Sequence, residues 1–154
     1  MNRVLMMAAV ALLGVAASGM GRAASPDYLG SWTVQGSEPA PWASSADKPV
    51  ASDLKALMGK TVVFRADRIE GPAPLGCRKP HYEIKQYDPD MLFQGNLTRP
   101  KAQATALGFA GSKVPTLETG CEGAIDFHFA GSDAAMFALN NRVYKMVRTK
   151  PPYR

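Results

Sequence analysis

The chain has 154 residues, a formal net charge of +5 at pH 7 and 46% hydrophobic residues, which is enough for one domain with a single buried core. Its Lys and Arg residues occur singly or in pairs and form no continuous basic segment. Because nucleic-acid-binding domains usually concentrate positive charge in such segments, the composition argues against DNA or RNA as a partner.

The first 25 residues have the pattern of a secretory signal peptide. Arg3 supplies a positive start, residues 4–17 form an apolar run, and residues 23–25 are the small residues at which signal peptidase cuts. The alternative is a membrane anchor, but Ala, Gly and Ser dilute the apolar run and no basic cluster follows it. We therefore predict a cleaved signal peptide at residues 1–25 and a single β domain at residues 26–154.

The same segment predicts the compartment of the mature chain. No Cys follows the apolar run, so the leader offers no site for a lipid, and we expect no stable membrane anchor after cleavage. Loss of Arg3 and Arg22 would lower the Lys and Arg count from 18 to 16 against 13 Asp and Glu residues, a net charge of +3. We expect a periplasmic protein of a Gram-negative bacterium, or a secreted one.

The mature chain begins with a predicted strand and a long loop. Apolar and polar residues alternate at residues 28–35, which predicts a strand, and a Pro-rich loop follows at residues 36–50. Ser52 can cap a short helix that ends at Gly59.

The middle of the chain predicts two further strands and a second helix. A β-branched run at residues 60–66 predicts a strand that continues toward Ile69. A Gly- and Pro-rich turn at residues 71–77 separates it from an alternating strand at residues 81–87. Residues 100–107 have helical composition, with Pro at the start and Gly after the end.

The last third predicts an antiparallel meander. Four short runs follow one another, at residues 114–119, 124–130, 134–139 and 143–148. Asn140 and Asn141 suit a tight hairpin, because Asn tolerates positive φ. Phe127 and Phe129 face one side of their run and His128 the other, which predicts one buried and one solvent-exposed face. The fold predicted is a mainly β, single-domain antiparallel barrel or sandwich of about seven short strands with one or two short helices.

The two cysteines, Cys77 and Cys121, predict one structural disulfide in an oxidising compartment. A redox or metal-binding pair is the alternative, but the chain has no C-x-x-C motif. In the chain-entropy model, closing the loop between Cys77 and Cys121 stabilises the fold by roughly 4 kcal/mol.

The two histidines are the candidates for a metal or acid–base site. Period-2 spacing places His81 beside Glu83 and His128 beside Asp126, and the disulfide would bring the two runs together. We expect both histidines instead to be half-exposed surface residues, and we expect no bound metal or cofactor. Sequence motifs for a catalytic nucleophile or a phosphate loop are absent, which argues against an enzyme. The remaining aromatic residues, Tyr87 among them, are expected in the core.

The tripeptide Gly30-Ser31-Trp32 resembles the G-x-W motif on the first strand of lipocalins and related calycin barrels. In that family the tryptophan closes one end of the barrel and an arginine from the last strand packs across it. The resemblance implies that Arg148, or alternatively Arg142, has this role here. It also implies a barrel whose open mouth takes an apolar ligand, although some such barrels are filled or act as inhibitors.

Three functions follow from these observations. The first is an exported, lipocalin-like binding protein for an apolar small molecule. The second is a protein-binding module, such as an inhibitor of a periplasmic hydrolase, that uses an exposed loop such as residues 36–50. The third is an enzyme or metal protein that uses His81 and His128. An open cavity lined by aromatic residues would favour the first function, and a filled core with an exposed loop would favour the second.

Overall fold

The computed structural model describes residues 27–149, so the predicted signal peptide lies outside the described residues. These residues form one curled antiparallel sheet of nine strands with three short helices. The mainly β prediction is therefore confirmed, whereas the expected numbers of about seven strands and one or two helices are wrong. Across residues 27–149, no helix is both long enough and apolar enough to span a membrane.

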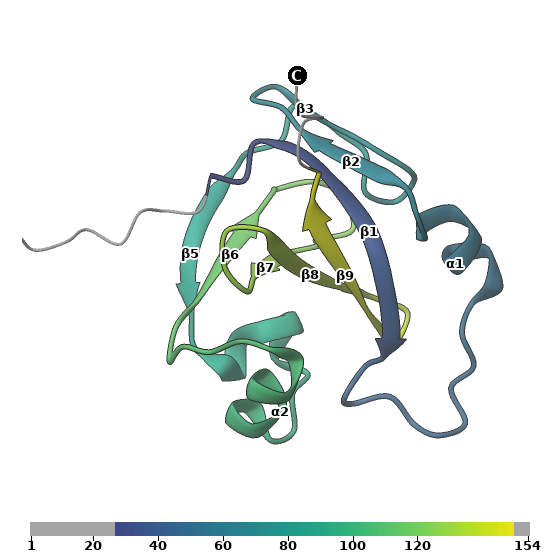
Figure 1. The fold of residues 1–154 in the computed structure, drawn as a ribbon, viewed down its shortest axis with the longest axis vertical. Coiled ribbons are helices and arrows are strands. Elements are labelled where there is room, and N and C mark those ends of the chain that lie inside the picture. Colours follow the sequence, from purple (N-terminus) through teal and green to yellow (C-terminus); the bar gives the residue numbers. More distant parts are fainter. Residues whose placement is uncertain (1–26, 150–154) are drawn as a thin grey trace, which may run out of the picture.

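The strands in chain order are β1 (Gly30–Pro39), β2 (Thr61–Phe64), β3 (Arg68–Glu70), β4 (Cys77–Arg78), β5 (Glu83–Tyr87), β6 (Val114–Glu118), β7 (Phe127–Phe129), β8 (Ala134–Leu139) and β9 (Arg142–Arg148). The helices are α1 (Ala51–Leu57), the 3-10 helix η1 (Pro89–Gly95) and α2 (Pro100–Leu107). The spatial order of the strands is β4-β3-β2-β1-β9-β8-β7-β6-β5. In Figure 1 the strands form an arch, with β5 and β6 on one side and β1 and β2 on the other.

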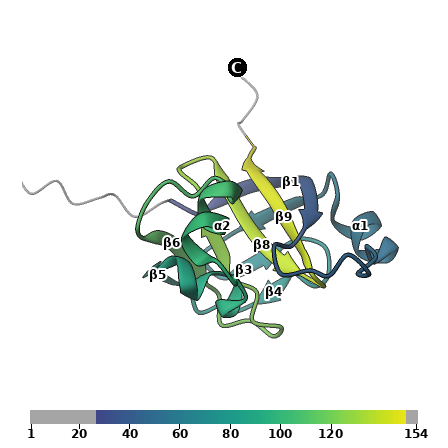
Figure 2. The same ribbon diagram turned by 90° about the horizontal axis from the view of Figure 1, so that it is seen from below.

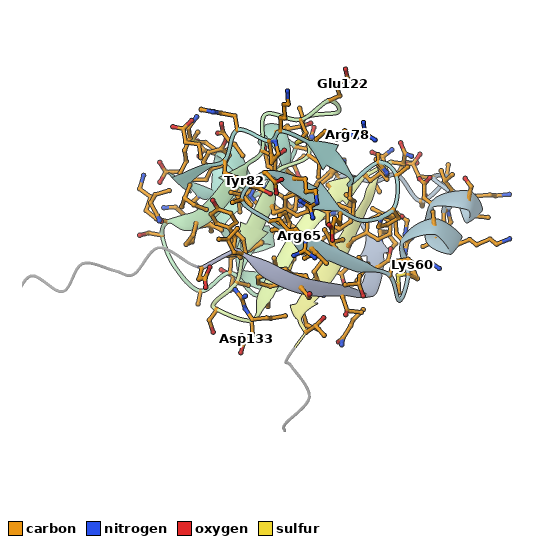
Figure 3. The ribbon with its side chains drawn as sticks, turned by 90° about the horizontal axis from the view of Figure 1, so that it is seen from above. Lys60, Arg65, Arg78, Tyr82, Glu122 and Asp133 are labelled. Atoms are coloured by element: carbon orange, nitrogen blue, oxygen red, sulfur yellow. A yellow bond between two sulfur atoms is a disulfide. The ribbon has the colours of Figure 1, made fainter. Side chains whose placement is uncertain are left out.

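Side chains connect the two ends of the sheet across its open side. The predicted disulfide between Cys77 and Cys121 is confirmed, with Cα atoms 6.0 Å apart, and it joins β4 to the turn before β7. The Tyr82 hydroxyl, just before β5, donates a hydrogen bond to the Arg65 carbonyl at 2.9 Å. Figure 3 looks onto this end of the molecule and shows Tyr82 and Arg65 near each other. The sheet is therefore a half-barrel whose open side is bridged by side chains.

The inner face of the curled sheet encloses an aromatic core. Phe64, Phe127 and Phe137 are at most 2% exposed. Phe127 packs edge-on against Phe64 with ring centroids 5.0 Å apart, and Phe137 stacks on Tyr144 at 5.1 Å. Leu57 of α1 is fully buried in the same cluster. Side chains from the strands and from α1 therefore fill the interior.

The outer face of the sheet carries a second core beneath η1 and α2. Leu92 and Phe93 of η1 and Leu107 of α2 belong to one buried cluster with Val114 of β6 and Met136 of β8. Figure 2, seen from below, shows α2 in front of the sheet. The part of the sheet formed by β6, β8 and β9 thus lies between two apolar layers.

The first strand is longer than predicted because its second half pairs with β9. This pairing continues to Pro39 across a bulge between Val34 and Gly36. The loop expected at residues 36–50 therefore begins only at Ala40.

Two other sequence predictions are wrong. The strand at residues 60–66 does not continue to Ile69, because the Arg65 amide donates to the Arg68 carbonyl at 2.9 Å and closes a turn between β2 and β3. The run at residues 124–130 has no solvent-exposed side within β7, whose three residues are all buried. The outer side of β7 is buried because η1 covers it.

Candidate functional site

A groove of about 950 Å³ lies between the start of η1, α2 and the segment that follows α2. We call it the outer groove; it is lined by residues 88–90, 99–102, 104–105 and 109–112. Its apolar lining consists of Pro89, Pro100, Ala102, Ala104, Phe109 and Ala110. Its volume falls in the range of small-molecule sites, roughly 300–1,000 Å³.

The floor of the outer groove is built by the end of α2. Gly108 has a φ of +100°, a conformation that glycine adopts easily, and its amide donates to the Thr105 carbonyl at 3.0 Å. The Phe109 amide then donates to the Ala104 carbonyl at 3.0 Å. This helix end turns the chain back, so that Phe109 and Ala104 are both buried beside each other.

Charged side chains stand around the outer groove. Asp88 is paired with Lys113 at 2.7 Å. Asp90, Arg99 and Lys101 are exposed and form no ion pair with any residue in the described part of the chain. Arg99 and Lys101 flank the start of α2, where the Arg99 amide donates to Gln103 Oε1 at 2.8 Å and no acidic residue lies in the first turn. This end of the outer groove is therefore positive.

A second polar cluster lies on the outer face of β5 and β6. Glu118 accepts hydrogen bonds from Lys85 Nζ at 2.8 Å and from the Tyr87 hydroxyl, and these bonds hold the pKa of Glu118 below its ordinary value. Burial and the charge of Glu118 raise the pKa of Asp126, and burial also raises the pKa of Tyr87. Two carboxyl groups whose pKa values are shifted in opposite directions, as those of Glu118 and Asp126 are, suit acid–base chemistry. However, Asp126 lines a cavity of only about 40 Å³, which has room for water but not for a substrate.

His128 is 1% exposed and connects β7 to η1 and β6. The Phe93 amide donates to Nε2 at 3.0 Å, so Nε2 carries no proton, and Nδ1–H donates to Thr116 Oγ1 at 2.8 Å. Burial lowers the pKa of His128 to about 3. Phe93 and Gln94 adopt positive φ values of 51° and 60°, which are strained for such residues. The neutral imidazole therefore holds a strained segment of η1 in place.

The structure does not gather the residues considered for a metal or acid–base site. His81 and Glu83 are exposed, whereas His128 is buried beneath Phe93 with ring centroids 4.6 Å apart. Within residues 27–149, no three His, Cys, Asp or Glu side chains are close enough together to hold a metal ion. The expectation that His128 would be half-exposed is wrong, because η1 covers it.

Trp32 is fully buried and lies directly opposite Arg148 in the pairing of β1 with β9. The Arg148 guanidinium carbon is 4.4 Å from the centroid of the Trp32 ring, and Nη1 donates to the Leu29 carbonyl at 2.9 Å. Trp32 Nε1 donates to the Tyr28 carbonyl at 3.0 Å. Gly30, with a φ of +113°, is in a conformation that favours glycine. These contacts fix Trp32 between β1 and the end of β9.

Sequence reasoning missed the outer groove. Tyr87 was expected in the core, and its ring does pack against the outer core, while its hydroxyl contacts Glu118. Period-2 spacing places Tyr87 on the same strand face as Lys85, which could have indicated the polar contact. One feature of the sequence could have indicated the outer groove. Arg99 and Lys101 lie at the start of a predicted helix, where positive charge is unfavourable.

Comparisons of the chain with protein-family models, with curated proteins and with solved structures give no match.

Proposed function

We propose that this protein is an exported binding module that holds an apolar small molecule in the outer groove. The observation that supports the proposal is the contrast between the two faces of the sheet. Aromatic side chains fill the inner face, whereas the outer groove offers a volume of about 950 Å³ with a mainly apolar lining. Volumes of this size accommodate small organic molecules.

A ligand inside the curled sheet would have to displace packed side chains. Trp32, Phe64 and Phe137 are fully or almost fully buried there, and loss of such packing costs about 3–5 kcal/mol for each large aromatic residue. The outer groove requires no such displacement. The Trp32–Arg148 contact favours a lipocalin-like closure of the barrel end, but we propose that the ligand binds outside the barrel.

The proposal includes export from the cytoplasm. Residues 1–25 have the pattern of a signal peptide, and the disulfide between Cys77 and Cys121 suits an oxidising compartment. N-terminal sequencing of the protein from its native host should begin between Ala24 and Pro26. Recovery of intact Met1 in the membrane fraction would contradict this part of the proposal.

The binding test uses N-phenyl-1-naphthylamine, a neutral apolar probe whose fluorescence rises in apolar surroundings. Thr105 is exposed on α2 and lines the outer groove, so Thr105→Trp should fill the groove and weaken binding by about tenfold or more, equivalent to about 1.4 kcal/mol. The matched control is Ala106→Trp, since Ala106 is exposed on the same helix but does not line the groove. Equal binding by both variants would overturn the proposed site.

A protein-binding function is the second candidate, because an exposed loop projects from a fixed base. Residues 44–50 are exposed, and Asp47 Oδ2 accepts hydrogen bonds from the Ser44 amide at 2.7 Å and from Asn141 Nδ2 at 3.3 Å. Trp42 Nε1 donates to the same Asn141 side chain at 3.2 Å. A loop held in one conformation before binding loses less entropy when it binds.

The loop hypothesis predicts inhibition of an exported hydrolase by the intact protein. In assays of purified cell-wall and peptide hydrolases, Asp47→Ala should weaken inhibition because it releases the loop from its base. A matched substitution at the other end of β8 from Asn141, Asp133→Ala, should leave inhibition unchanged. If the wild-type protein inhibits none of these enzymes, this second function is rejected.

A further inference from the structure

We infer that the occupant of the outer groove is an anionic amphiphile, whose acidic group binds between Arg99 and Lys101 and whose apolar chain lies over Phe109. This inference rests on the proposed function, because it uses the same groove. It adds the chemical class of the ligand and its orientation.

The positive end of the groove is formed by a helix end and two basic side chains that both line it. The backbone N–H groups at the start of a helix carry partial positive charge, so Arg99 and Lys101 add like charge where an acidic residue would normally be favourable. Neither side chain has an ion-pair partner among residues 27–149. A bound carboxylate or phosphate would relieve this repulsion.

The acidic residues of the groove do not cancel this charge. Asp88 is neutralised by Lys113, at 2.7 Å. Asp90 is the remaining carboxylate of the lining, and it belongs to η1 rather than to α2. Two unpaired basic groups therefore face one unpaired acidic group, and charge complementarity favours an anionic ligand with its acidic group at the start of α2.

The apolar chain of the ligand can lie on the apolar residues of the groove lining. Phe109 and Ala104 are 3% and 2% exposed and form the floor, and Pro89 and Ala110 line the groove beside them. A linear chain fits an open groove of this kind better than a flat rigid ring system, because it can follow the turn from α2 into residues 109–112. A medium-chain fatty acid has both required features.

The test compares dodecanoate with two matched probes, dodecyltrimethylammonium and acetate, by calorimetry at pH 8 and below the micellar concentration. Dodecanoate should bind most tightly, since the cationic probe has the same chain with the opposite charge and acetate has the acidic group alone. Replacement of both basic residues, Arg99→Gln with Lys101→Gln, should weaken dodecanoate binding by about 5–30-fold, as expected for two partly exposed charge contacts. Binding should also weaken as salt is added.

The matched control removes the same charge elsewhere. Lys55 and Lys60 lie in or just after α1 and do not line the groove, so Lys55→Gln with Lys60→Gln should leave dodecanoate binding within about twofold. Thermal unfolding of each variant checks that the fold is intact. Equal dodecanoate affinity of the Arg99/Lys101 variant and the wild type would overturn the inference.

The outcomes separate this inference from the proposed function. If N-phenyl-1-naphthylamine binding is blocked by Thr105→Trp but dodecanoate affinity does not depend on Arg99 and Lys101, the groove binds apolar molecules without selecting an anion, and only the inference fails. If Thr105→Trp weakens the binding of neither N-phenyl-1-naphthylamine nor dodecanoate, the proposed function fails as well. Tighter binding of a peptide with a free terminal carboxylate than of dodecanoate would replace the amphiphile by a protein terminus and overturn the inference.

Discussion

The inner and outer faces of the sheet are closed in different ways. On the inner face the strands themselves curl around aromatic side chains, and α1 contributes Leu57 to this core. On the outer face a separate segment, η1 with α2, lies across the strands and leaves the outer groove beside it. A face closed by its own strands has little room for change, whereas a face covered by a short added segment can contain a binding site without opening the main core.

The polar groups follow the same division. The outer face includes buried His128 and Thr116, whose hydrogen bonds position η1. The inner face is dominated by Phe, Trp and Leu side chains. We therefore expect the inner face to determine overall stability and the outer face to determine local structure and binding.

The largest expected effect comes from the two tryptophans, one on each face. Trp32→Ala should lower the free energy of unfolding by about 3–5 kcal/mol, because it removes a fully buried indole and its contact with Arg148. Trp42→Ala should cost less, about 1–2 kcal/mol, because Trp42 is partly exposed and packs on Phe93 at the edge of the outer core. Urea unfolding of both variants measures the difference. Equal losses would contradict the division between the two faces.

The second prediction concerns the open side of the half-barrel. Replacement of both Cys77 and Cys121 by Ala should lower the free energy of unfolding by about 2–4 kcal/mol, since the disulfide closes a 44-residue separation and links β4 to the turn before β7. The effect should appear as a lower urea midpoint, measured under the same oxidising conditions as the wild type. Reducing agent should destabilise the wild type but not the double variant. A double variant as stable as the wild type would show that Tyr82 and strand pairing suffice to hold the edges.

Local sequence patterns predicted elements that depend on neighbouring residues along the chain. The strand β8 and the helix α2 have the predicted bounds, and Asn140 and Asn141 adopt the positive φ values of 47° and 57° expected for a tight turn. Trp32 was expected in the core and is fully buried there, whereas the resemblance left Arg148 and Arg142 as alternative partners, of which Arg148 lies over the ring. These features depend on turn chemistry and periodicity, which a single sequence contains.

The elements that were missed depend on tertiary contacts. β1 reaches Pro39 because β9 pairs with its second half, and no local pattern shows this. His128 alternates with Phe127 and Phe129 as an exposed residue would, and only the packing of η1 buries it. The outer groove could not be located for the same reason, since it exists only where η1, α2 and residues 109–112 meet.

The third prediction tests how the outer face holds η1. The pKa of His128 is about 3 in the folded protein and about 6.5 when unfolded, so between these values the unfolded chain takes up a proton that the folded protein does not. Stability should therefore fall as pH drops below about 6.5, by up to about 1.4 kcal/mol per pH unit. Between pH 7 and 5.5 the expected loss is about 1 kcal/mol.

Two variants isolate this effect. His128→Gln should remove the loss between pH 7 and 5.5, although it lowers stability at both values because the Phe93 amide loses its acceptor. His81→Gln, at an exposed position, should keep the wild-type dependence. If His128→Gln does not fold, the ring resonances of wild-type His128 should still show no protonation down to pH 4 by NMR. Protonation of His128 near pH 6 would contradict its burial beneath η1.

The smallest expected effect distinguishes the two arginines of β9 as partners of Trp32. Arg148 lies over the indole ring at 4.4 Å, whereas Arg142 Nε donates to Ser37 Oγ at 2.8 Å at the other end of the strand. A double-mutant cycle between Trp32→Phe and Arg148→Ala should give a coupling of about 0.5–1 kcal/mol, because a phenyl ring attracts the guanidinium less than an indole does. The corresponding cycle with Arg142→Ala should give a coupling near zero. Trp32→Phe keeps most of the buried area, so the cycle reports the contact rather than a cavity. A coupling shared equally by both arginines would mean that the end of the half-barrel is closed by general packing and not by this cation–aromatic pair.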